Sequence, residues 1–128
     1  MPPEISPQAL LVLSTCPQEK AAELARLLVE GRFAACVNVI DRVESFYFWE
    51  GKLNRDAESL LLIKTAPARF EALKQALLAA HPYEMPEIIA LGVSGGNPRY
   101  LAWVAESSRP APVFSPPDPP GGSTGGAG

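Results

Sequence analysis

The sequence predicts an α+β fold: a ferredoxin-like βαββαβ plait with an antiparallel sheet and an extra C-terminal helix. Apolar stripes at helical spacing alternate along the chain with runs rich in β-branched and aromatic residues. The two longest of these runs are separated only by a tight turn, which predicts a central hairpin. Helices that alternate with strands around such a hairpin are typical of the plait.

The first βα unit follows from residues 9–31. Residues 9–14 form a short apolar run, which predicts a buried strand. Pro17 and Glu19 suit the first turn of a helix, where a missing N–H and a negative charge are both tolerated. Gly31 is a natural C-cap for that helix. Its apolar stripe consists of Ala21, Leu24, Leu27 and Leu28.

The central hairpin is expected from residues 33–49 and 53–65, both rich in strand-forming side chains. Residues 50–52 predict the turn between them. Residues 41–42 predict a bend or bulge within the first strand. Because side chains alternate between the faces of a strand, one face carries Ser45, Tyr47 and Trp49, and the other carries Phe46 and Phe48.

The second half of the plait contains a helix, which begins at Pro67, followed by the fourth strand at residues 87–93. Pro67 opens a helix whose apolar stripe contains Phe70, Leu73, Leu77 and Ala80. The segment 81–87 (HPYEMPE) ends that helix, because its two prolines stiffen the backbone. Residues 87–93 predict the fourth strand. Asn97 and Pro98 then predict the N-cap and first turn of a short terminal helix.

The expected strand order, 4-1-3-2, leaves the second and fourth strands at the edges of the sheet. Those edges are long for a small domain, and the sheet face without helices carries aromatic side chains. Exposed edges promote association unless they are covered. The sequence therefore predicts oligomerisation with closed symmetry, as a small ring.

Composition limits the classes of partner that this protein is expected to have. The chain has 128 residues and 13.7 kDa, with a net charge of −3 and a pI near 5.1. Such a balance predicts no nucleic-acid partner. No apolar run reaches the roughly 18 residues needed to cross a bilayer, so no membrane partner is expected. The start of the chain lacks the pattern of a secretion signal, which predicts a cytoplasmic protein with two free cysteines.

The chain divides into three parts on composition. Residues 1–7 are expected to be a loose N-terminus and residues 8–107 the folded domain. Residues 108–128 are rich in proline and glycine, which predicts a disordered tail.

The segment 81–87 is the most informative for function. It contains the only histidine, His81, three residues before Glu84 and six before Glu87. Imidazole and carboxylate groups are common metal ligands and common proton-transfer groups.

These features resemble the CutA family of divalent-cation-tolerance proteins. The matching segments are spread in order over 8–107 and include 14–17 (STCP), 34–38 (AACVN), 45–52 (SFYFWEGK), 63–65 (IKT), 81–88 (HPYEMPEI) and 100–103 (YLAW). The resemblance implies a ferredoxin-like subunit and a homotrimer similar in architecture to PII signalling proteins. It also implies a link to tolerance of copper and other divalent metals, and it supplies no agreed enzymatic reaction.

The resemblance implies that Cys16, His81 and Glu84 are the metal ligands. Thiolate and imidazole suit Cu(I), Cu(II) and other divalent metals, with none obligatory. Cys16 is expected at a helix N-terminus, which would lower the pKa of its thiol. The alternative is that His81 caps its helix or bonds to a neighbour and that Cys16 is a plain thiol.

A second constellation comprises Asn38, Trp49, Glu58, Lys64, Tyr83 and Glu87. One interpretation is a polar pocket at the subunit cleft for a small anionic ligand. The other is a salt-bridge network that fixes the register of the trimer.

Three functions follow in order of preference. The first is a trimeric divalent-cation (copper) tolerance protein that binds or responds to metal ions. The second is a PII-like signalling or scaffold protein that presents its loops to an unknown protein partner and in which metal binding is incidental. The third is an enzyme using His81 with a carboxylate. No nucleophile or cofactor motif supports it, so we expect no enzyme.

Overall fold

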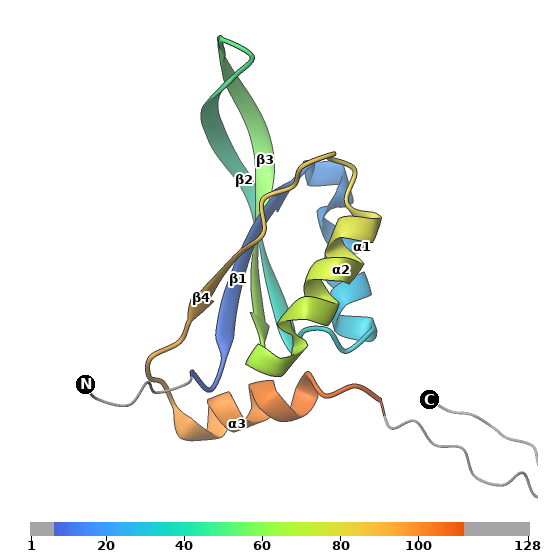
Figure 1. The fold of residues 1–128 in the computed structure, drawn as a ribbon, viewed down its shortest axis with the longest axis vertical. Helices are drawn as coiled ribbons and strands as arrows, with labels where there is room; N and C mark the ends of the chain where they lie inside the picture. The colour runs from blue at the N-terminus through green and yellow to red at the C-terminus, as the bar shows by residue number, and fades with distance from the viewer. Residues whose placement is uncertain (1–6, 112–128) are drawn as a thin grey trace, which may run out of the picture.

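The structure, a computed structural model, describes residues 7–111. Four strands and three α-helices follow one another in the order β1-α1-β2-β3-α2-β4-α3 (Figure 1). Their bounds are β1 Leu10–Cys16, α1 Ala21–Glu30, β2 Cys36–Trp49, β3 Lys52–Thr65, α2 Phe70–Ala80, β4 Ile89–Gly92 and α3 Pro98–Ser107. Short 3-10 turns, Gln18–Lys20 and Pro67–Arg69, lead into α1 and α2.

The four strands form one antiparallel sheet in the order β2-β3-β1-β4. The predicted ferredoxin-like plait is therefore confirmed, with β2 and β4 at its edges and α3 as the extra C-terminal helix. In the β1–β3 pair, Leu10 lies opposite Thr65 and Cys16 lies opposite Ser59. The side chains of β1 thus alternate between a helix-covered face and an open face.

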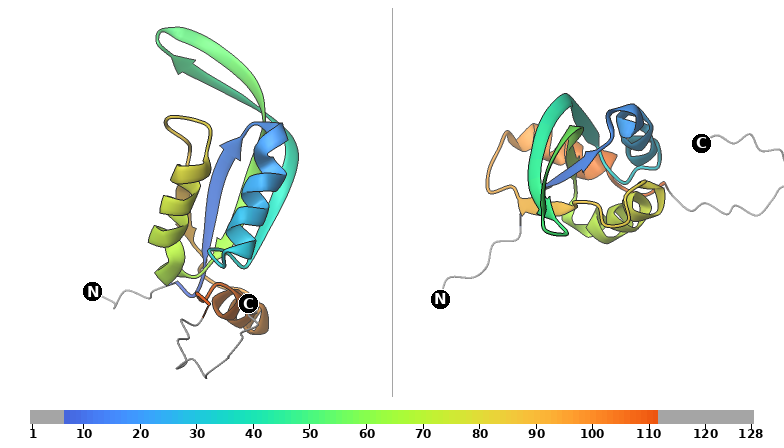
Figure 2. Two further views of the ribbon diagram at one scale, coloured as in Figure 1. Left: turned by 90° about the vertical axis from the view of Figure 1, so that its right-hand side faces the viewer. Right: turned by 90° about the horizontal axis from the view of Figure 1, so that it is seen from above.

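Helices α1 and α2 lie side by side on one face of the sheet (Figures 1 and 2). The core fills the space between these two helices and the sheet. Its fully buried large side chains are Val12, Leu24, Leu28, Leu61, Ile63, Leu73 and Leu77. The stripe predicted for α1 is confirmed at three of its positions, while Leu27 remains 38% exposed at the edge of the helix.

The opposite, open face of the sheet is apolar and bare over much of its area. Leu11 and Leu13 of β1 lie on it, because they alternate with the buried Val12. Their partners on β4, Leu91 and Ile89, are 47% and 49% exposed. Of the elements in residues 7–111, only α3 approaches this side, across one end of the sheet (Figure 2).

The β2–β3 hairpin extends beyond the rest of the sheet (Figure 1). The predicted bend at 41–42 is confirmed as a bulge between Ile40 and Val43, where the β2–β3 register shifts. The hairpin closes through Glu50 and Gly51, whose φ angles are 53° and 77°. Two successive positive φ values are characteristic of a type I′ turn.

Several strand boundaries differ from the prediction: β4 spans Ile89–Gly92 instead of residues 87–93, and the largest other differences are in β1 and β2. Strand β1 continues to Cys16 instead of stopping at Ser14, because its last residue still pairs with Ser59 of β3. Strand β2 starts at Cys36 instead of residue 33. Residues 31–35 are needed to end α1: the N–H groups of Phe33 and Ala34 both donate to the Leu28 carbonyl.

The terminal segments are only partly covered. Residues 1–6 and 112–128 lie outside the described residues, so the predicted loose N-terminus and disordered tail stay predictions. At the described C-terminal end, the buried Ser108 donates its hydroxyl hydrogen to the Val104 carbonyl. Within residues 7–111, no helix is both long and apolar enough to cross a membrane.

Candidate functional site

His81 lies at the C-terminal end of α2, next to the end of β1. Its Nε2 atom is 2.8 Å from the Thr15 carbonyl oxygen, and its Nδ1 accepts a hydrogen bond of 3.1 Å from the Tyr83 N–H. These partners assign the neutral tautomer with the proton on Nε2. His81 is 7% exposed, and both ring nitrogens are occupied. The arrangement favours the capping interpretation of this histidine.

Cys16 does not have the accessible thiolate that the sequence predicted. As the last residue of β1 it points to the helix-covered face and is fully buried. Burial and, to a smaller extent, the nearby Glu58 and Glu19 carboxylates together raise the pKa of its thiol to about 11. The prediction of a lowered pKa is therefore wrong, because β1 runs two residues further than expected and carries Cys16 into the core.

A hollow of about 680 Å³ adjoins His81 at the base of the hairpin, and we call it the rim pocket. It is bounded by the β2–β3 hairpin, the end of β1 and the segment after α2. Its lining residues are Thr15, Ser45, Phe46, Tyr47, Trp49, Asp56, Glu58, Tyr83, Glu84, Met85 and Glu87. Five predicted site residues therefore meet there: Trp49, Glu58, Tyr83, Glu84 and Glu87.

Glu58 is the most buried charged residue of the rim pocket, at 7% exposed. Its two carboxylate oxygens each accept one hydrogen bond, from the Ser45 hydroxyl at 2.7 Å and from the Tyr83 hydroxyl at 2.6 Å. Burial and the bond to Glu58 both raise the pKa of Tyr83, so its phenol remains a donor. The carboxylate is thus held in one orientation by two neutral donors.

Lys64 and Asn38 do not line the rim pocket. Lys64 lies six residues along β3 from Glu58, a span of about 20 Å in an extended strand. Its ammonium sits 5.6 Å from the centre of the Tyr100 ring of α3. Asn38 lies opposite Leu62, in the same half of the sheet as Lys64. Within one subunit the second constellation is therefore divided between two places.

Asp56 and Tyr47 are among the pocket residues that the sequence analysis did not assign to the site. Asp56 accepts a hydrogen bond from the Tyr47 hydroxyl, and this bond is the main reason that the pKa of Tyr47 is raised. Even spacing gave a usable signal, because Asp56 and Glu58 are two apart on β3. Tyr47 had been placed on the correct face of β2 but not assigned to the site.

The three predicted metal ligands do not present free donors together. The Cys16 thiol is protonated inside the core, and both nitrogens of His81 are hydrogen-bonded. Only Glu84 lines the pocket. No group of three or more His, Cys, Asp or Glu side chains among residues 7–111 is arranged to hold a metal ion. The predicted donor set suits copper chemically but does not fit a metal ion as arranged.

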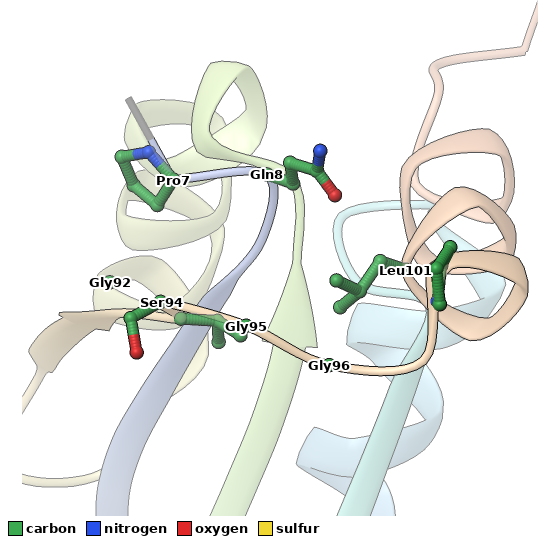
Figure 3. A pocket seen from close by; sticks show the side chains of 9 residues that line it. Pro7, Gln8, Gly92, Ser94, Gly95, Gly96 and Leu101 are labelled. Carbon is green, nitrogen blue, oxygen red and sulfur yellow. The ribbon is translucent and has the colours of Figure 1, made fainter. Parts of the chain in front are cut away.

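A second hollow, of about 570 Å³, lies beside α3 (Figure 3). It is formed by Pro7 and Gln8, the glycine-rich connection after β4 and Leu101 of α3. None of its lining residues is charged. The glycine-rich segment is thus a connection between β4 and α3.

Comparisons with known proteins give the family. Residues 10–107 match the family model of the CutA1 divalent ion tolerance protein. Protein CutA of Mus musculus is 52% identical over 91 residues, which are 70% of this chain and 51% of the relative. The divalent-cation tolerance protein CutA of Thermus thermophilus is 46% identical over 99 residues, covering 77% of this chain and 96% of the relative.

A solved structure agrees with this assignment. The structure of the PII-like protein CutA from Nostoc sp. PCC 7120, in apo form, is similar with a TM-score of 0.76. It is 34% identical in sequence and covers 80% of this chain and 99% of that structure. This chain spans only about half the length of the mouse relative.

Proposed function

We propose that this chain, which belongs to the CutA1 divalent ion tolerance family, is a subunit of a homotrimer that binds or responds to divalent metal ions. The match over residues 10–107 carries the proposal, because it includes every element that forms the rim pocket. The role is non-catalytic and cytoplasmic in this proposal, and copper is the first metal to test.

The bare open face of the sheet supports assembly. In the isolated subunit Ile89 and Leu91 are about half exposed and Leu11 and Leu13 are partly exposed, and β2 and β4 form the edges of the described sheet. Contiguous apolar patches of this kind mark interfaces. The number three comes from the family. Light scattering at micromolar concentration should give about three times the chain mass of 13.7 kDa. A mass equal to one chain would contradict the trimer.

Metal binding at Cys16, His81 and Glu84 stays a prediction, and matched variants test it. His81→Gln keeps an acceptor for the Tyr83 N–H and a donor for the Thr15 carbonyl but removes the imidazole. Glu84→Gln removes one charge at constant shape. If these residues rearrange to hold copper, titration calorimetry with Cu(II) will show binding weaker by about tenfold or more in each variant, and Cys16→Ala will act likewise for Cu(I). Unchanged affinities in all three would exclude this ligand set.

The PII-like signalling or scaffold role is the second candidate. The hydrogen-bonded nitrogens of His81 and the buried thiol of Cys16 favour it, because neither side chain needs a metal ion to satisfy its polar atoms. In that case the hairpin and the segment after α2 would contact a partner. Pull-down of a specific partner that survives chelation supports this role. Loss of the partner on chelation would instead support a role in binding or responding to metal ions.

A further inference from the structure

The charged side chains that form no salt bridge within residues 7–111 are separated along the long axis of the molecule. The acidic ones are the four carboxylates of the rim pocket together with Glu19, Asp41 and Glu50. The basic ones are Arg32, Lys52, Lys64, Arg69 and Arg99. The two sets lie at opposite ends of the fold, and Lys52 in the hairpin is the exception.

The unpaired acidic side chains lie at the end that carries the hairpin, which we call the rim end (Figure 1). Glu50 is in the hairpin turn itself. Glu19 is in the 3-10 turn that follows β1. Asp41 lies at the same level, because its carbonyl accepts a hydrogen bond from the Gln18 side chain of that turn. The rim end is therefore acidic.

Four of the five unpaired basic side chains lie at the opposite end, which we call the base end and where α3 crosses the sheet (Figures 1 and 2). Arg32 follows α1 and Arg69 precedes α2. They are neighbours, because the Arg69 guanidinium donates to the Arg32 carbonyl at 3.1 and 3.2 Å. Arg99 is in the first turn of α3 and Lys64 is near the end of β3. The base end is therefore basic.

The two ends are too far apart to neutralise each other within one chain. From Glu58 to Lys64 along β3 the distance is about 20 Å. Charges in water are screened over about 8 Å at physiological salt. Each end thus keeps its own sign, and the base end of one molecule is complementary in charge to the rim end of another.

Assembly through the open face of the sheet leaves charges of both signs accessible. Arg32, Glu19 and Glu84 are exposed and lie next to the ends of α1 and α2, which cover the other face of the sheet. Glu50 is exposed at the tip of the hairpin. A contact between the ends therefore does not compete with the proposed trimer interface.

We propose that the base end of one molecule docks on the rim end of a second copy. The two surfaces differ, so the contact is heterologous and does not close, and molecules stack in a row. Exposed ion pairs are individually weak and are screened by salt, so the stacking is reversible and depends on ionic strength. This contact goes beyond the proposed role in metal tolerance and requires no metal ion.

Sedimentation equilibrium of the full-length protein in excess EDTA tests the contact. At about 30 mM salt the weight-average mass should rise with protein concentration to more than about twice its value at 0.5 M salt, where it should stay constant. A constant mass at low salt, or growth that persists at high salt, overturns the proposal. A mass that stops at about twice the high-salt value would show a closed contact between identical surfaces, which also overturns it.

Two double variants of equal net charge distinguish a contact between the ends from a general charge effect. Arg32→Gln with Arg99→Gln removes two charges from the base end and should weaken the association about tenfold or more. Arg42→Gln with Lys52→Gln removes two charges from the hairpin and should preserve or strengthen the association, because the rim end becomes more acidic. Equal weakening in the two double variants overturns the proposal. Circular dichroism and the mass at high salt confirm that each variant keeps its fold and assembly.

Discussion

At the scale of single residues, Cys16 shows that the burial and the pKa of a side chain depend on where its strand ends. The thiol is fully buried and its pKa is raised from 9.0 to about 11. In the unfolded chain it ionises near pH 9, whereas in the folded chain it stays protonated. The native state is therefore stabilised fully below pH 9, and this contribution falls as the pH rises from 9 to 11.

We expect the unfolding free energy of the wild-type protein to fall by about 1 kcal/mol per chain more between pH 8 and 10 than that of Cys16→Ala. The variant is less stable at pH 8, because it leaves a small cavity, but its pH dependence is flatter. Chemical denaturation at several pH values measures both slopes. Parallel slopes would mean that the Cys16 thiol ionises as easily in the folded protein as in the unfolded chain.

His81 should be a structural residue even if no metal binds. His81→Ala removes an acceptor from the Tyr83 N–H and a donor from the Thr15 carbonyl. We expect a loss of about 1–3 kcal/mol in unfolding free energy, because buried groups are left unpaired. His81→Gln should recover part of it. Equal losses in the two variants would show that the imidazole ring matters through packing alone.

Single residues also show which parts of the candidate site could be predicted from the sequence. The sequence analysis placed Glu58, Tyr83 and Glu87 in one constellation, and all three line the rim pocket in the structure. The sequence analysis grouped Glu58 with Lys64 because even spacing gives them a shared face. The strand predicted over residues 53–65 already separates them by about 20 Å, so this division of the constellation was predictable and was missed.

At the scale of elements, the hairpin turn carries strain that can be removed. Glu50 has φ 53° in a two-residue turn with Gly51. A left-handed conformation costs a residue such as Glu about 1 kcal/mol, whereas Asn-Gly is the preferred pair for this turn. Glu50→Asn should raise the unfolding free energy by about 0.5–1 kcal/mol, measured by thermal or chemical unfolding.

Gly51→Ala is the matched opposite change. Nothing lies within 4 Å of a Cβ atom added there, so its only penalty is the positive φ of 77°. We expect a loss of about 1 kcal/mol. Stability that does not differ between the two variants would mean that the turn adopts another conformation in solution.

Element boundaries were predicted less well than element types, and the end of α1 shows why. Gly31 was correctly placed at the C-cap, but the left-handed residue is Arg32, with φ 61°. The glycine is needed for space instead: a Cβ atom on it would lie 2.6 Å from the Phe33 ring. Such close packing depends on tertiary structure and leaves no signal in a single sequence.

At the scale of the whole molecule, the two faces of the sheet have different roles. Helices α1 and α2 complete the core on one face, so that face needs no further partner. The open face presents Leu11, Leu13, Ile89 and Leu91 around β1 and β4. A subunit that exposes these side chains is expected to be stable only in its assembly, so folding and association become one process.

The pair Leu91→Lys and Leu78→Lys tests this division of faces. The two leucines are equally exposed in the subunit, at 47% and 44%, but Leu91 lies on the open face and Leu78 on α2. A lysine on the open face buries a charge in the proposed interface, so Leu91→Lys should lower the mass measured by light scattering to that of one chain or prevent folding. Leu78→Lys should keep the mass of the wild type. If both variants assemble normally, the open face is not where the subunits meet, and the edge strands become the next surface to test.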